Sequence, residues 1–196
     1  MNREENPMKR DRREFIKTVT AGDLTASLVP LSVSGEEEKP KTNTEGTSPK
    51  SRGEMANACM QKYGSCCSGV LAVYAAEVGM DQDLAGAAGR GMAGGIGGLG
   101  NVCGAVSGAV MAIGLKTTNE NNIHDMQAGM KAMETVREFV ARFEEQHSSI
   151  QCSELIGYDI SSTEKSMLAM KENAFEKCPG YVESAVNILD DLLAKG

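Results

Sequence analysis

The chain has 196 residues, a formal net charge of −7 and 41% hydrophobic residues, which suits one globular domain with appended segments. The negative charge argues against a nucleic-acid partner, because proteins that bind nucleic acids neutralise phosphates with Lys and Arg. There is no Trp and only 4% aromatic residue, but there are 12 Met and 22 Gly. A core made of such small and flexible side chains favours closely packed helices.

Residues 1–34 read as an export signal. Arg12 and Arg13 precede Glu14-Phe15-Ile16-Lys17, a pattern that resembles the twin-arginine signal, and a weakly apolar stretch and the small residues Ser32-Val33-Ser34 follow. Asp23 interrupts the apolar stretch and favours the alternative, a chance Arg pair at a basic terminus. We expect an exported, periplasmic or otherwise extracytoplasmic protein that meets the membrane only through this signal.

Residues 35–55 predict a disordered linker. They are rich in Glu, Lys, Thr, Ser, Gly and Pro and hold almost no large apolar side chain. Such a segment cannot bury enough apolar surface to offset the loss of chain entropy on ordering. The linker would tether the signal to a folded domain at residues 56–196.

The first half of this domain predicts a long helix, a short helix and a glycine-rich loop. The long helix runs from residue 55 to Gly79, which can end it in a left-handed conformation. Asp81 or Asp83 caps the short helix, which continues through Leu84 and Ala88, and the loop covers residues 89–100. The stripe that supports the long helix consists of Ala58, Tyr63, Cys66, Val70, Tyr74 and Val78.

The second half predicts further helices and no strand. Asn101 would cap a helix over residues 102–115, and helices are expected at 123–146, 152–157, 163–175 and 179–194, the last with Pro179 in its first turn. The 123–146 helix has an apolar stripe of Met126, Met130, Met133, Val136, Phe139, Val140 and Phe143. The predicted fold class is all-α, a compact bundle of about five to six helices with a Gly-rich loop.

The 25 residues between Arg90 and Lys116 carry no charge, and a segment of this length could span a bilayer. Nine of them are Gly, so we favour a buried core helix instead. Gly104, Gly108 and Ala112 recur at steps of four, which predicts a face that another backbone approaches closely. The glycine strings do not predict a dinucleotide site, because a helical segment and not a strand precedes them.

Four separate cysteines are the candidate site: Cys66, Cys103, Cys152 and Cys178. Thiolates bind zinc, copper(I) and iron–sulfur clusters, and they also act as redox nucleophiles. Cys103 begins a predicted helix, where the helix dipole and free amides lower a thiol pKa. The neighbouring glycine loop is expected to be either flexible or tightly turned beside Cys103, so that its amides can approach a metal centre.

The arrangement of these cysteines resembles the C_GCAxxG_C_C family of redox-active proteins from Ser65 to about Leu193. The matching segments are Ser65-Cys66-Cys67-Ser68-Gly69-Val70-Leu71, the glycine run 89–100, Val102 to Lys116 around Cys103-Gly104-Ala105-Val106-Ser107-Gly108, Ile150-Gln151-Cys152-Ser153-Glu154-Leu155-Ile156-Gly157, and Cys178-Pro179-Gly180-Tyr181-Val182. The resemblance implies a small, mostly helical protein. Some relatives are exported or accompany oxidoreductases and electron-transfer components, and some related domains hold an iron–sulfur centre.

The resemblance selects Cys66 rather than the adjacent Cys67, and adjacent helical side chains diverge by about 100°. Cys67 is then expected to be a buried small residue. Cys59, two helical turns before Cys66, is either a spare ligand, a resolving thiol or an ordinary helix residue. Ser153 stands where relatives often carry a basic residue. The two histidines, His124 and His147, are expected at the surface, although His147 could reach the same centre as Cys152.

We therefore expect an exported redox protein whose Cys66, Cys103, Cys152 and Cys178 hold a metal centre, preferably a 2Fe–2S cluster, for electron transfer with a partner oxidoreductase or cytochrome. One alternative is a metal-free thiol–disulfide redox protein or a protein with structural disulfides. Another is a zinc- or copper-binding protein. The pattern does not decide whether the protein is an enzyme, and it leaves room for a homodimer.

The export hypothesis predicts the effect of changing the arginine pair. Replacing Arg12→Lys together with Arg13→Lys should leave the protein in the cytoplasm, because the signal relies on both arginines. Immunoblots of periplasmic and cytoplasmic fractions measure the distribution. Unchanged periplasmic recovery of the double variant would remove the export claim.

Overall fold

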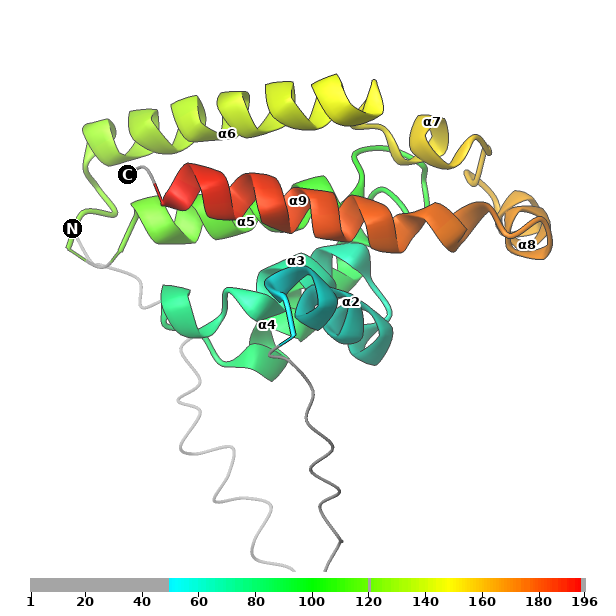
Figure 1. Ribbon diagram of the computed structural model, residues 1–196, viewed down its shortest axis with the longest axis horizontal. Helices are drawn as coiled ribbons and strands as arrows, with labels where there is room; N and C mark the ends of the chain where they lie inside the picture. Colours follow the sequence, from blue (N-terminus) through cyan, green and yellow to red (C-terminus); the bar gives the residue numbers. More distant parts are fainter. Residues whose placement is uncertain (1–49, 120, 195–196) are drawn as a thin grey trace, which may run out of the picture. The chain divides into compact units, whose positions relative to one another are not determined.

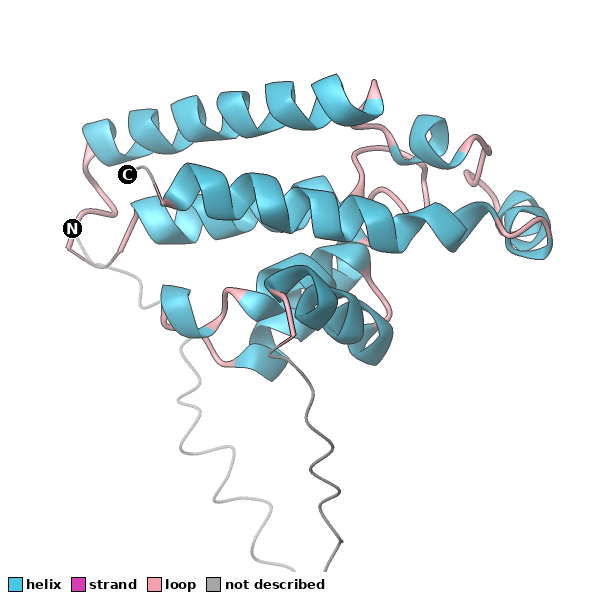
Figure 2. Cartoon of the chain, in the orientation of Figure 1, coloured by secondary structure: helices cyan, strands magenta, loops and turns pink. Residues whose placement is uncertain are grey.

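The computed structural model describes residues 50–119 and 121–194, all of which are helical, turn or loop apart from one isolated antiparallel bridge between Val102 and Gln151 (Figure 2). The predicted signal with Arg12 and Arg13, and most of the predicted linker, lie outside the described residues. The predicted all-α class is confirmed. Its α-helices are α2 (Arg52–Tyr63), α3 (Cys66–Val73), α4 (Gln82–Gly89), α5 (Gly104–Thr117), α6 (Met126–His147), α7 (Cys152–Ile156), α8 (Thr163–Lys171) and α9 (Cys178–Leu193).

The described ranges hold eight α-helices, more than the five to six predicted, and three short 3-10 turns (Ala76–Val78, Arg90–Met92 and Ala174–Lys177). Helix α9 lies at the centre, where α2, α3, α5 and α6 all pack against it (Figure 1). Helix α3 also packs against α2, α4 and α5. Helices α7 and α8 connect α6 to α9 (Figure 1).

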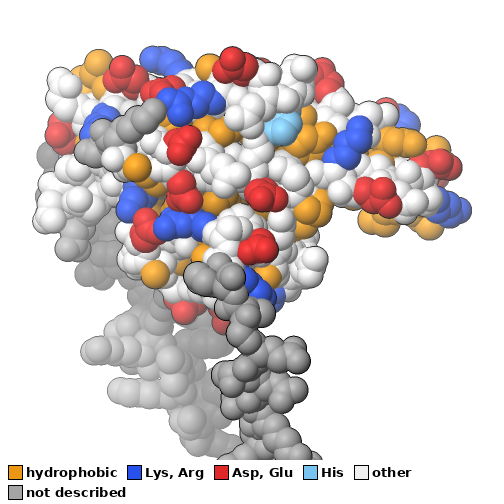
Figure 3. Space-filling model, in the orientation of Figure 1, with side chains coloured by type: hydrophobic (Ala, Val, Ile, Leu, Met, Phe, Trp, Pro, Cys, Tyr) orange, Lys and Arg blue, Asp and Glu red, His pale blue; other side chains and the backbone are white. Residues whose placement is uncertain are grey.

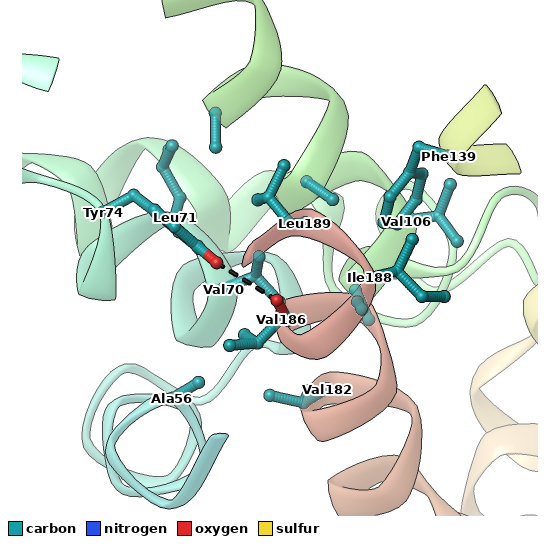
Figure 4. Packing of buried hydrophobic residues seen from close by; sticks show 14 of the residues in the cluster. Ala56, Val70, Leu71, Tyr74, Val106, Phe139, Val182, Val186, Ile188 and Leu189 are labelled. Carbon is teal, nitrogen blue, oxygen red and sulfur yellow. Dashed lines mark hydrogen bonds between the residues drawn. The ribbon is translucent and has the colours of Figure 1, made fainter. Parts of the chain in front are cut away.

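The core between α3, α5, α6 and α9 is built from aliphatic side chains and two phenylalanines. Figure 4 shows Val70 and Leu71 facing Val186 and Leu189 of α9. Tyr74, also buried, donates hydrogen bonds to the Val186 carbonyl (3.2 Å) and to Asp190 Oδ1 (2.7 Å). Each such apolar side chain contributes about 1.5–3 kcal/mol when fully buried.

The prediction of one long helix from residue 55 to Gly79 is wrong, because the helix is interrupted at Gly64. Gly64 takes a left-handed backbone with φ 71° and ends α2. Ser65 then caps α3, where its hydroxyl accepts a hydrogen bond from the Ser68 amide. The break makes Cys66 the first residue of a new helix. The predicted caps at Gly79 and Asp81 are confirmed.

The predicted linker ends too late. Ser51 and Glu54 form reciprocal side-chain-to-backbone hydrogen bonds, so α2 already begins at Arg52. Two other helix boundaries differ from the prediction. Cys103, and not Asn101, caps α5. The predicted 163–175 helix ends at Lys171, because Asn173 takes a left-handed φ of 56°.

The stripe predicted for residues 123–146 is buried only in its second half. Phe139 and Phe143 are fully buried against α5 and α9. Met126, Met130 and Met133 are 77%, 52% and 54% exposed, so the first half of the predicted stripe faces solvent. Periodicity shows which face of a helix is apolar, but not how far along the helix a neighbour covers it.

Helices α3 and α5 approach each other along the small face predicted at Gly104, Gly108 and Ala112, and this prediction is confirmed. A Cβ on Gly108 would lie 2.7 Å from the Cys67 carbonyl oxygen and 2.9 Å from Val70 Cβ. A Cβ on Gly104 would lie 3.0 Å from the Cys67 amide nitrogen. The backbone of α3 therefore occupies the place of the missing side chains. No helix in the described ranges is long and apolar enough to cross a membrane.

This contact predicts that Gly108→Leu lowers the free energy of unfolding by about 1–3 kcal/mol or more, because the new side chain overpacks the α3 interface. Gly114→Leu is the matched control on the same helix, since nothing lies within 4 Å of its added Cβ. Chemical denaturation of both variants measures the difference. Equal midpoints for the two variants would contradict the close approach.

Candidate four-cysteine site

All four predicted site cysteines lie at the starts of helices. Cys66, Cys152 and Cys178 are the first residues of α3, α7 and α9, and Cys103 is the N-cap of α5. The start of a helix carries a partial positive charge and amides without intrahelical acceptors. Cys66, Cys103 and Cys152 therefore lie where their helices favour negative charge. The sequence indicated this position for Cys103 alone. The 3-10 turn Ala174–Lys177 runs directly into α9, so the Cys178 amide already donates to the Phe175 carbonyl.

Backbone hydrogen bonds hold Cys103 beside Cys152. The Cys103 amide donates to the Ile150 carbonyl (2.7 Å), and the Cys152 amide donates to the Asn101 carbonyl (2.6 Å). Val102 and Gln151 form the antiparallel bridge between these two bonds. The bridge joins the entrance of α5 to the entrance of α7, although the two cysteines are far apart in sequence.

The glycine-rich loop between α4 and α5 closes against this bridge. Five of its glycines have positive φ, namely Gly94, Gly95, Gly97, Gly98 and Gly100. Ile96 also has a positive φ, of 61°. A Cβ on Gly95 would lie 2.8 Å from Cys152 Cβ and 2.6 Å from the Asn101 amide nitrogen. The tightly turned loop predicted here is therefore confirmed, and it packs against Cys152 as well as leading into Cys103.

Cys66 joins the site through the close approach of α3 and α5. A Cβ on Gly104, the residue after Cys103, would lie 3.2 Å from Cys66 Cβ. The thiol of Cys66 in turn lies beside the thiol of Cys178, at the start of α9, near enough for each to shift the other's pKa. Four segments that are distant in sequence thus meet at one place.

The thiols influence one another's pKa values. The hydrogen bond to Cys178, burial, and charge repulsion from Cys178, Cys103 and Cys152 all raise the pKa of Cys66. Burial and repulsion from Cys103 and Cys178 raise the pKa of Cys152 to about 12. The hydrogen bond from Cys66 lowers the pKa of Cys178, against the opposing effect of burial. Without a nearby cation, the site therefore favours one thiolate, at Cys178.

Burial outweighs the helix start at Cys103. The amides of Ala105 and Val106 act to lower the Cys103 pKa, although no capping hydrogen bond to its sulfur forms, while burial raises the pKa more strongly. The expectation of a net lowered pKa at Cys103 is therefore wrong. The side chain is only 4% exposed, so desolvation of the thiolate dominates.

The site has a buried side and an open side. Cys103 and Cys152 are 4% and 6% exposed. Cys66 and Cys178 are half-buried and line a cavity of about 460 Å³ that opens to solvent. Access to the thiols from outside is therefore through Cys66 and Cys178.

The remaining cysteines and histidines do not line the cavity, although burial and the charge of nearby Cys103 both raise the pKa of Cys67. Cys67 is fully buried, as predicted, with its Sγ 3.9 Å from Met111 Sδ. Cys59 faces α4, where Gln82 Nε2 lies 3.9 Å from its sulfur. His147 packs on Phe143 and hydrogen-bonds Ser184 (2.8 Å), and His124 is exposed.

Tyr181 borders the site, which sequence reasoning missed. Burial and repulsion from Cys178, Cys103 and Cys152 raise the pKa of Tyr181, and its hydroxyl donates to the Leu155 carbonyl (2.7 Å). The ring also meets His147 edge-on, with 5.0 Å between ring centres. Its position three residues after Cys178, one turn along α9, is the signal that could have placed it beside the thiols.

The ligand atoms suit a thiophilic metal centre, because four thiols meet at the starts of four helices. Residues 50–119 and 121–194 hold no group of three or more His, Cys, Asp or Glu side chains arranged as ligands of a metal ion. The sulfurs of one tetrahedral zinc ion lie about 3.8 Å apart, as follows from Zn–S bonds of about 2.3 Å. The thiols are gathered around one place, but in the described ranges they do not form such a ligand group.

Comparison with protein families matches residues 64–192 to the C_GCAxxG_C_C family, whose description reads "Putative redox-active protein". The match covers most of the chain, so the protein belongs to this family. No curated protein and no solved structure matches the chain.

The interaction of Cys66 with Cys178 predicts an order of reactivity in metal-free, reduced protein. Cys178 should be alkylated by iodoacetamide at lower pH than Cys59, because its lowered pKa yields thiolate earlier, whereas burial raises the Cys59 pKa. Mass spectrometry of peptides after timed alkylation gives the pH profile of each thiol. The variant Cys66→Ala should move the Cys178 profile to higher pH. A Cys178 profile that does not respond to Cys66→Ala would show that the two thiols do not interact.

Proposed function

We propose that this member of the redox-active family uses Cys66, Cys103, Cys152 and Cys178 to hold an iron–sulfur cluster for electron transfer. The observation that carries the proposal is the meeting of these four thiols at four helix starts. An iron–sulfur cluster takes four thiolates and is anionic with them, so positive helix ends around it are favourable.

The electrostatics of the metal-free thiols also support a cationic centre. Deprotonating Cys66, Cys103 and Cys152 together is unfavourable, because burial and mutual repulsion raise each pKa. Metal cations at the centre offset that repulsion, and binding them releases the thiol protons. A cluster with four thiolate ligands would use one thiol from each of the four segments.

When bound, the cluster would supply one-electron transfer. The chain's own residues would set its surroundings. Cys103 and Cys152 would anchor its buried side, and Cys66 and Cys178 the side nearer to solvent. The amides of Ala105 and Val106, which already act on the Cys103 sulfur, would stabilise its negative charge. Tyr181 would limit water access on the α7 side, where its hydroxyl is engaged by Leu155.

One observation favours a second candidate function, a dithiol–disulfide pair. Cys66 and Cys178 lie together at the open side of the site, and the lowered pKa of Cys178 makes it the better nucleophile. Thiol–disulfide exchange would let the Cys178 thiolate attack a disulfide of a partner, releasing one partner thiolate. Attack by Cys66 on the resulting mixed disulfide would then release the second partner thiol and leave a Cys66–Cys178 disulfide.

We also propose that the protein acts outside the cytoplasm, with an oxidoreductase or cytochrome as its partner. The support is the Arg12–Arg13 pattern and the small residues at 32–34. Export of folded protein would suit a domain whose cofactor is inserted before transport.

The cluster proposal predicts that Cys66→Ser, Cys103→Ser, Cys152→Ser and Cys178→Ser each cut bound iron severely, because serine replaces a thiolate ligand poorly. Cys59→Ser and Cys67→Ser should retain iron and serve as controls. The measurements are elemental analysis, a visible spectrum and a thiol count on protein purified without oxygen. Loss of iron should also lower the thermal midpoint, since the ligands join four segments.

The disulfide candidate predicts a different pattern in the same experiment. Wild-type protein would hold negligible metal, and the losses of redox titre would come in pairs, with Cys66→Ser equivalent to Cys178→Ser. Wild-type protein free of iron, zinc and copper under these conditions would overturn the cluster proposal.

A further inference from the structure

The cavity beside the four-cysteine site has a composition that the cluster does not explain. It measures about 460 Å³, within the range of about 300–1,000 Å³ typical of small-molecule sites. Its walls come from α2, the start of α3, the glycine-rich loop, α8 and the start of α9. Only Cys66 and Cys178 of the four cysteines reach it.

The walls are apolar and uncharged. None of the side chains that line the cavity in the described part of the chain is ionisable apart from the two thiols, and its largest members include Met60, Ile160, Met170 and Phe175. A charged ligand would lose its hydration there without gaining an ion pair, at a high cost in free energy. The occupant must therefore be uncharged and mostly apolar.

The polar component of the cavity is small. Ser65 and Ser166 line it, but their hydroxyls donate hydrogen bonds to backbone carbonyls (both 2.9 Å). Gly94, Gly97 and Gly98 line one wall without side chains, so a ligand can approach their backbone directly. The amides of Gly97 and Gly98 already donate within the loop, so the backbone offers carbonyl oxygens there. The site therefore offers mainly apolar contacts and two thiols, which suits a mostly apolar compound.

The rim of the cavity is itself apolar and solvent-exposed. Met170, at the rim, is 64% exposed, and its neighbours on α8, Met167 and Leu168, are 55% and 54% exposed. Figure 3 shows hydrophobic side chains at the surface on this end of the molecule. Methionine side chains adapt to ligands of different shape. A second hollow, along α6, is lined by Lys131, Glu134 and Arg137 as well as methionines and reaches no thiol, so it does not share these properties.

From these observations we propose that the cavity is a substrate site, in which an uncharged, mostly apolar small molecule binds against Cys66 and Cys178. The proposal rests on the proposed redox function of the four cysteines and gives that site a substrate class. A concave site enclosed by four segments favours a small molecule over a partner protein, whose contact surface would be broader and flatter. Binding would place the ligand beside the open side of the redox centre, while Cys103 and Cys152 stay covered.

The test uses Nile red, an uncharged apolar dye, on full-length protein purified without oxygen. Fluorescence titration should show saturable binding. Met170→Glu should weaken it about five- to tenfold, because a carboxylate at the rim replaces an apolar contact. Met167→Glu is the matched control, a methionine of similar exposure on the same helix outside the cavity lining, and it should leave the affinity within about twofold, well short of tenfold.

A second readout ties binding to the thiols. In metal-free, reduced protein, saturating dye should slow alkylation of Cys178 and Cys66 by N-ethylmaleimide, measured on peptides by mass spectrometry, and leave Cys59 unaffected. Ala93→Phe, which fills the cavity from the loop, should abolish both dye binding and protection, with folding checked by circular dichroism.

The outcomes separate this proposal from the cluster. Iron content should be the same in Met170→Glu and wild type, so loss of dye binding with iron retained supports the cavity as a distinct binding site. Equal affinities of Met170→Glu and Met167→Glu, or dye binding that leaves both thiols fully reactive, would overturn the substrate site whether or not iron is present. Dye binding with protection in protein that never holds iron would keep the cavity and refute the cluster.

Discussion

The close contact between α3 and α5 is the constraint on which the site depends. The backbone of α3 lies where side chains on Gly104 and Gly108 would be, so the two helices can meet only if both positions stay glycine. This approach sets the start of α3 beside the start of α5 and so brings Cys66 to Cys103. A larger residue at either position would separate the two helix starts and open one side of the site.

The other two thiols are added by contacts at the same end of the helices. The hydrogen bonds between residues 100–103 and 150–153 place Cys152, and packing of α9 on α3 and α5 places Cys178. Cys66, Cys103 and Cys152 then lie at helix starts, where partial positive charge partly offsets their burial. Burial and repulsion still raise three of the four thiol pKa values. A site that collects thiols yet disfavours thiolates is suited to a positively charged centre that neutralises them.

Local signals in the sequence predicted the helical class, the cap at Asp81, the turned glycine loop and the small face of α5. The signals that failed were either overlooked or not local. Gly64-Ser65 is a recognisable signal for the end of one helix and the start of the next. The apolar stripe continues across it by coincidence and concealed the signal. The exposed methionines of α6 could not be predicted, because no pattern states where the neighbouring helix ends. Tyr181 follows Cys178 by one helical turn, a local signal that was overlooked. The Asn101–Cys152 hydrogen bond depends on contact between distant segments, and a single sequence does not encode this contact in any local pattern.

The central claim is that the four thiols bind one polynuclear centre together. X-ray absorption at the iron edge, on full-length protein purified without oxygen, tests it most directly, because the spectrum reports both the ligand atoms and any neighbouring metal. The account predicts iron surrounded by sulfur alone, with a second iron at cluster distance, and loss of this signal in Cys103→Ser but not in Cys67→Ser. Iron bound by oxygen or nitrogen, a mononuclear site, or the absence of iron would contradict it.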